Sequence, residues 1–259
     1  MTKGRQGFSR DTFVRTMRWL FLILLSSTAA AGDSLTQLRT TLQKYPGAAP
    51  FRVEAALQVR GDAQQSKEDP RSGSVTFEAD DGPAGFGIHV TRPVVEQTER
   101  ESAEKKADPD RLTPTRTAMV AMTIFDVMDT LNAAQMLLGD LDGATLLNES
   151  PAQYRDKPAT VLHVKVKPTL AGTRSRLVKA PQIELTIWID SDGLPLAAER
   201  KSNYSAGVLM VNVQNNRKET WQLAVRGDRI YALTSDEENR ASGLGKTFVT
   251  FRSVTYQVR

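Results

Sequence analysis

The sequence contains no cysteine among its 259 residues. No disulfide can therefore stabilise the fold, and no thiolate can serve as a nucleophile or as a zinc ligand. The same absence excludes a lipid-modified N-terminus, because a bacterial lipoprotein carries its lipid on a cysteine at the cleavage site. A chain of this length can bury enough apolar surface to fold without such cross-links.

Histidine is almost as scarce. The two residues, His89 and His163, lie in separate strand-like runs, whereas a zinc site needs three or four converging ligands. No Gly-x-Ser-x-Gly motif marks a nucleophile elbow. The stretch 190–193 resembles the start of a calcium loop, but Leu194 and Pro195 stand where further ligands would follow. We therefore expect no catalytic residues, no metal and no cofactor, and a protein that is not an enzyme.

Long apolar runs are missing after the N-terminus. Residues 1–31 hold five basic side chains, then the apolar run Trp19–Leu25, and end in three alanines. This order is typical of a secretory signal peptide cleaved after Ala31. The run is shorter than the roughly 20 apolar residues that span a bilayer. The sequence predicts a periplasmic protein with no transmembrane anchor after cleavage.

The rest of the chain, residues 32–259, has no excess of positive or negative charge. Five of the 34 basic residues and one of the 30 acidic residues lie in the leader, which leaves 29 of each sign. A nucleic-acid partner would favour a basic patch or stripe, and this balance gives no support for one. No internal repeat is visible, so we expect a single domain over 32–259.

What is abundant is alternation of apolar and polar residues with a period of two, the pattern of half-buried antiparallel strands. Turns are predicted at 191–193, 226–228 and Asn215-Asn216. The side chains expected on buried strand faces are Phe51, Val53, Leu57, Ile183, Leu185, Ile187 and Ile189. The fold class predicted is α+β, with one curved antiparallel sheet (a half-barrel) and helices packed on its concave face.

Two segments have helical spacing instead. Residues 33–44 read as a short amphipathic helix, and 114–138 as a longer one that stops at Gly139. The longer helix is apolar over much of its circumference and is therefore expected to be buried. Charged stretches at 61–72 and 96–111 are expected to be loops, the second alternatively a solvated helix.

The longer helix is rich in methionine, at positions 119, 122, 128 and 136. Methionine is flexible and polarisable, so it repacks around variable apolar partners. One interpretation is an adaptable lid over the concave face of the sheet. The alternative is ordinary core, because methionines at helical spacing usually pack there.

The order of elements resembles that of a known superfamily. The local matches are 51–54, 73–77, the strand ending in Thr91-Arg92-Pro93, and the run 187–195 with its acidic turn and Leu-Pro. With the signal peptide, these residues resemble the LolA/LolB-like half-barrels, periplasmic lipoprotein carriers and related sensors. That resemblance implies an incomplete barrel whose concave face holds acyl chains, and it makes Arg92 a candidate ligand-side residue.

These observations predict a non-catalytic, carrier-like periplasmic protein that binds an apolar ligand, either a lipid or a lipoprotein acyl chain. The expected ligand-binding residues are Arg92, Met119, Met122, Phe125 and Met128. One alternative is a periplasmic sensor or a structural module that binds an envelope protein. The other is an enzyme that uses the cavity for small-molecule chemistry.

Overall fold

The computed structural model describes residues 33–63, 72–168, 178–208 and 211–259. The helices are α1 (Asp33–Gln43), α2 (Arg92–Ala107), α3 (Pro114–Ala121), α4 (Ile124–Leu131) and α5 (Ala133–Leu141). The strands are β1 (Phe51–Ala63), β2 (Ser72–Gly82), β3 (Gly85–His89), β4 (Thr145–Tyr154), β5 (Lys157–Val166), β6 (Val178–Ile189), β7 (Pro195–Val208), β8 (Val211–Arg226), β9 (Arg229–Gly243) and β10 (Lys246–Val258). The predicted signal peptide and most of the charged stretch 61–72 lie outside the described residues.

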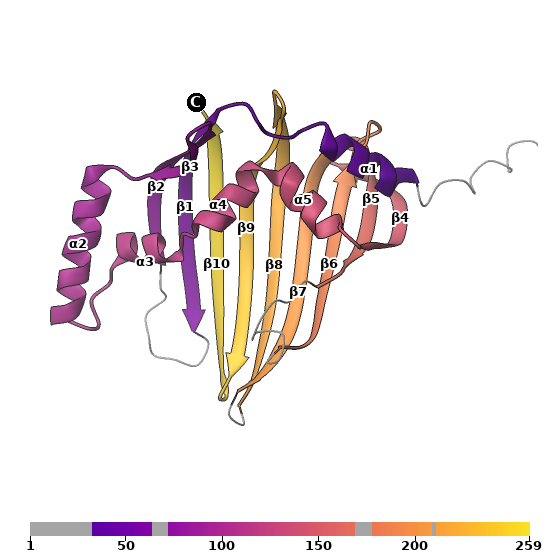
Figure 1. Cartoon of the computed structure of the whole chain (residues 1–259). Coiled ribbons are helices and arrows are strands. Elements are labelled where there is room, and N and C mark those ends of the chain that lie inside the picture. The colour runs from indigo at the N-terminus through magenta and orange to yellow at the C-terminus, as the bar shows by residue number, and fades with distance from the viewer. Residues whose placement is uncertain (1–32, 64–71, 169–177, 209–210) are drawn as a thin grey trace, which may run out of the picture.

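The predicted fold class is confirmed: the strands form one antiparallel sheet in the order β3-β2-β1-β10-β9-β8-β7-β6-β5-β4. Strands β4 to β10 form a continuous meander, and β10 then pairs with β1. Because β3 and β4 lie at opposite edges, the chain must cross the whole sheet between them. Helices α3 to α5 make that crossing over one face, and α1 joins them there (Figure 1).

The period-two pattern is confirmed by burial. On the helix-covered face, Val53 and Leu57 of β1 are buried beside Val258 and Val254 of β10. Six of the seven side chains expected to be buried are buried, and Ile183 is half-buried against the same core. That core continues into the leucines of α1, α4 and α5. Burial of each such side chain contributes about 1.5–3 kcal/mol to stability.

The turns at 191–193 and 226–228 are confirmed, and the turn at Asn215-Asn216 is wrong. Both asparagines lie inside β8, where Asn215 pairs with Tyr204 and Asn216 with Asn203 of β7. Asn215 also donates from Nδ2 to Asn239 Oδ1 on β9 at 2.9 Å. A cross-strand amide hydrogen bond replaces the local turn that asparagine usually favours.

The single helix predicted over 114–138 is wrong in detail, since three short helices occupy 114–141 and the last one continues past Gly139 to Leu141. Between α3 and α4 the chain is extended, and the Thr123 hydroxyl accepts a hydrogen bond from the Asp126 N–H at 3.2 Å, which caps α4. Asn132 separates α4 from α5 with φ −121° and ψ 49°. These two breaks let the helical layer change direction as it crosses the sheet.

The charged stretch 96–111 is mainly helical, as part of α2, so the loop interpretation is wrong. Glu101 of α2 is buried and accepts hydrogen bonds from the backbone N–H groups of Arg116 at 2.8 Å and Thr115 at 3.3 Å. These donors belong to the first turn of α3, where backbone N–H groups have no partner within the helix. One carboxylate thus joins α2 to α3. Burial raises the pKa of Glu101, but these hydrogen bonds outweigh burial and leave that pKa below its usual value.

Arg229 joins the helical layer to the sheet. It opens β9 and only 2% of its side chain is exposed. Its guanidinium donates to Asp81 Oδ2, to Asn132 Oδ1 and to the carbonyl oxygens of Gly47, Ala49 and Leu131. The guanidinium also lies 5.1 Å from the ring centroid of Phe51. The segment after α1, the end of β2 and the α4–α5 junction therefore meet at one buried cation.

Candidate functional site

The layer between α3–α4 and the sheet is the site that the sequence predicts. Met119 and Met122 are half-buried and pack against the core of the helix-covered face. Met128 is also half-buried, but it lines a different, open cavity together with Met136 and Asp129. The structure thus places Met119 and Met122, two of the four predicted apolar residues, against the core.

The remaining two of the five predicted ligand-binding residues, Phe125 and Arg92, lie elsewhere. The Phe125 side chain is 69% exposed on the outer side of α4. Arg92 begins α2, with 89% of its side chain exposed, and its Nε donates to Glu96 of the same helix at 2.7 Å. Neither side chain faces the layer between helix and sheet.

The space between α4 and the sheet is nearly filled. It holds a cavity of about 10 Å³, whose lining includes Leu57, Met122, Val127 and Tyr256. That volume is at the lower limit for a single water molecule. An acyl chain would therefore enter this layer only if α3–α4 moved away from the sheet.

A group of buried and half-buried ion pairs connects α4 and α5 with strands β7 to β10. We call it the arginine network; its members are Arg200, Arg217, Arg252, Asp126, Asp140, Glu219 and Glu237. All of its arginines lie on strands and on the helix-covered face. Asp126 of α4 and Asp140 of α5 are the two members that the helices supply.

The network ties α4 to the sheet at one point. Arg252 donates through Nη1 to Asp126 and to the carbonyl oxygen of Ala121 at 3.4 Å, and its Nη2 lies 2.6 Å from Glu237 Oε2. Arg217 lies 2.9 Å from Glu237 and 3.9 Å from Asp126. Asp126 and Arg252 also line the small cavity under α4, so the tether borders the space that a ligand would use.

A second tether holds α5. Arg200 of β7 contacts Asp140 at 3.1 Å and Glu219 at 2.8 Å, and its guanidinium lies 5.2 Å from the ring centroid of Trp221. Only 22% of the Arg200 side chain and 16% of the Asp140 side chain are exposed. Ion pairs this far from solvent are costly to break, because each partner would be left with an unpaired buried charge.

The two helix carboxylates respond differently to their surroundings. Burial raises the pKa of Asp126, but the Thr123 hydrogen bond and the Arg252 charge outweigh it, so this pKa is lowered. For Asp140, burial dominates over the attraction of Arg200, and the pKa is raised. Burial likewise raises the pKa of Tyr256, to about 12, although its hydroxyl shares a hydrogen bond with Thr130.

Sequence reasoning missed the arginine network. Most of its strand members have polar or charged neighbours in the sequence, as Arg200 has Glu199 and Lys201, so each one alone reads as a solvent-facing residue. Only the register reveals the group, because it aligns Arg200 with Glu219 and Arg252 with Glu237. Pairs of opposite charge at facing positions are the signal that a correct register would have exposed.

Neither histidine belongs to the arginine network or to a cluster of possible metal ligands among the described residues. His89 pairs with Asp80 on the exposed β2–β3 hairpin, and His163 shares a hydrogen bond with Thr186 at 3.2 Å. Within the described residues no group of three or more His, Asp or Glu side chains is placed to hold a metal ion. No helix in the described ranges is both long and apolar enough to cross a membrane.

No protein-family model matches this chain, and no curated protein matches it.

Proposed function

We propose that this protein is a non-catalytic periplasmic binding protein of the LolA/LolB-like half-barrel type. Its ligand would be an apolar chain, of a lipid or a lipoprotein, held between α3–α4 and the sheet. The observation that carries the proposal is the construction of α4. This helix packs on the sheet through apolar side chains and is bounded by breaks at both ends. Its first turn is held to the sheet by the ion pair between Asp126 and Arg252.

The energy of the ion-pair tether alone would not prevent α4 from opening as a lid on binding. Breaking the tether would cost up to about 3–5 kcal/mol, the usual range for removing one partner of a buried ion pair. An apolar chain gains about 0.8 kcal/mol for each methylene that it buries. A chain of about ten methylenes would gain about 8 kcal/mol, which exceeds that cost. Met119 and Met122 suit such a contact because methionine adapts to chains of different shape.

The test is a titration of the purified protein with a dansyl-labelled undecanoic acid, followed by fluorescence. Saturable binding is expected. Met122→Glu should weaken it at least tenfold, because a carboxylate would face the bound chain. Phe125→Ser is the matched control on the outer side of α4 and should leave binding unchanged. Asp126→Asn should tighten binding, because a larger fraction of molecules would be open before the ligand arrives.

A second candidate function is supported by the outer side of the same helices. Val120, Ile124 and Phe125 are 72%, 49% and 69% exposed, and they are close in sequence around the α3–α4 break. Exposed apolar groups that gather in this way often mark an interaction surface. If the native protein fails to bind the labelled acid, a module that docks an envelope protein through this surface becomes the better account.

A further inference from the structure

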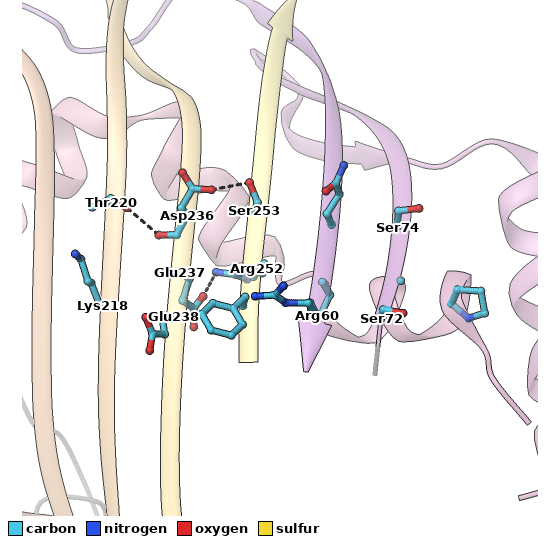
Figure 2. Close-up of a pocket in the computed structure, with 15 residues that line it drawn as sticks. Arg60, Ser72, Ser74, Lys218, Thr220, Asp236, Glu237, Glu238, Arg252 and Ser253 are labelled. Atoms are coloured by element: carbon cyan, nitrogen blue, oxygen red, sulfur yellow. Dashed lines mark hydrogen bonds and ion pairs between the residues drawn. The ribbon is translucent and has the colours of Figure 1, made fainter. Parts of the chain in front are cut away.

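The face of the sheet away from the helices carries a second candidate site. Residues that pair across antiparallel strands lie on the same face, and neighbours along a strand lie on opposite faces. Val59 and Arg252 pair on the helix-covered face, so Arg60 and Phe251 pair on the other one. Figure 2 shows Arg60, Lys218 and Glu238 on this second face, with the helices behind the sheet.

The register continues this pairing into one row across the sheet. In order from β6 to β2 the row consists of Glu184, Lys201, Lys218, Glu238, Phe251, Arg60 and Ser72. Six spacings between neighbouring strands, at about 4.8 Å each, give the row a length of about 29 Å.

The surface along this row is hollowed. A cavity of about 760 Å³ lies over β8, β9, β10, β1 and β2. It shares Lys218 and Glu238 with a cavity of about 380 Å³ toward β6, and Gln58 and Ser74 with one of about 450 Å³ that reaches Val94 of α2. Together they form one elongated depression, which we call the cross-strand groove.

The charges of the groove balance. On this face of the sheet the cations are Arg60, Lys201, Lys218 and Arg240, and the anions are Glu184, Asp236 and Glu238, with Glu199 beside them. Arg217, Glu237 and Arg252 also border the cavities, but the register places them on the helix-covered face. Glu199 contacts Lys201 at 2.9 Å and Lys218 at 3.0 Å, so these two lysines share one carboxylate. A polyanion such as a nucleic acid would favour a basic surface instead. The groove therefore suits a ligand without net charge.

The centre of the groove holds a platform made of two stacked side chains. The Arg60 guanidinium lies 4.7 Å from the ring centroid of Phe251. Around this pair stand hydroxyl, amide and carboxylate groups, among them Asp236, whose Oδ1 accepts a hydrogen bond from the Ser253 hydroxyl at 2.6 Å. A pyranose ring has an apolar C–H face and an edge of hydroxyl groups that both donate and accept. An aromatic ring bordered by polar side chains meets both requirements.

We propose that the cross-strand groove binds a linear, neutral oligosaccharide. One sugar unit lies on the Arg60–Phe251 platform, and the neighbouring units extend along the row, hydrogen-bonded to side chains such as Asp236, Gln58 and Lys218. The site is on the opposite face from the apolar-chain site, so either proposal can fail without the other.

The test is isothermal titration calorimetry of the purified protein with chitohexaose, cellohexaose and maltohexaose. Saturable binding of at least one of them is expected. Phe251→Ala should weaken it at least tenfold. Phe248→Ala is the matched control, because Phe248 lies on the same strand but on the helix-covered face and is 43% exposed. It should leave the affinity unchanged.

Asp236→Asn provides a second variant that does not alter the packing of an aromatic ring, and it should weaken binding at least threefold. Circular dichroism verifies that each variant is folded. The proposal is overturned if none of the hexasaccharides binds at millimolar concentration, or if Phe248→Ala reduces affinity as much as Phe251→Ala. Unchanged binding by both Phe251→Ala and Asp236→Asn would equally place the ligand elsewhere.

Discussion

Replacing Arg229 by methionine is expected to lower the free energy of unfolding by about 3–5 kcal/mol, the range found when one partner of a buried ion pair is removed. Methionine keeps an unbranched apolar stem, so the change isolates the guanidinium. Asp81 would lose its cation, and the carbonyl oxygens of Gly47, Ala49 and Leu131 would lose a donor. Each buried acceptor left without a partner costs about 1–3 kcal/mol, reduced where water can enter.

Urea denaturation followed by circular dichroism measures this loss. The matched control is Arg226→Met, an exposed arginine at the other end of the same β8–β9 turn, which should change stability by no more than about 0.5 kcal/mol. Adding Asp81→Asn to Arg229→Met should cost less than the two single changes together, because the partners are coupled. A loss below about 1 kcal/mol for Arg229→Met would refute the view that this cation holds the helices to the sheet.

Five further changes test other contacts. Gly73→Ala should destabilise the protein by about 1–3 kcal/mol, because its Cβ would lie 2.0 Å from the carbonyl oxygen of Pro114. Gly139→Ala meets nothing within 4 Å and should stabilise α5 by up to about 1 kcal/mol; thermal unfolding compares the pair. Glu101→Gln should cost about 1.5–3 kcal/mol at pH 7. Because the pKa of Glu101 is lowered on folding, its contribution is present above the ordinary value of 4.5 and is lost as the pH falls through the folded-state pKa. The variant and the native protein should therefore converge in acid, as urea titrations at several pH values would reveal. Asp126→Asn should destabilise more than Asp140→Asn at pH 7, since the pKa is lowered for Asp126 and raised for Asp140; equal losses in urea denaturation would contradict this order.

The strands could be predicted from the sequence because one face of the sheet is apolar over most of its length. Alternation alone placed Val53, Leu57 and Leu185 in the core, and burial agrees. Alternation did not reveal that Asn215 and Asn216 lie inside a strand instead of a turn. Asparagine favours turns when it acts alone, but here its amide finds Asn239 on the neighbouring strand.

The helical region shows a second limit. The apolar spacing predicted helix over 114–138, and most of that range is helical. The break at Asn132 depends on tertiary contacts, because its side chain is held by Asp81 and Arg229, which are distant in sequence. Phe125, the second residue of α4, is 69% exposed, which the apolar spacing did not indicate. The ligand-binding roles of Arg92, Phe125 and the three methionines stay predictions.

The position of β10 constrains the order in which this protein can fold. This strand fills the gap between β1, near the start of the described chain, and β9, so the sheet is in two parts until residues 246–258 are available. Pairing of β1 with β10 joins residues about two hundred positions apart, and such long-range contacts form slowly. A chain that is synthesised from its N-terminus exposes the open side of β1 until β10 has been made. That unpaired edge is a template for other strands, so the open side of β1 is the segment most exposed to mispairing until β10 is in place.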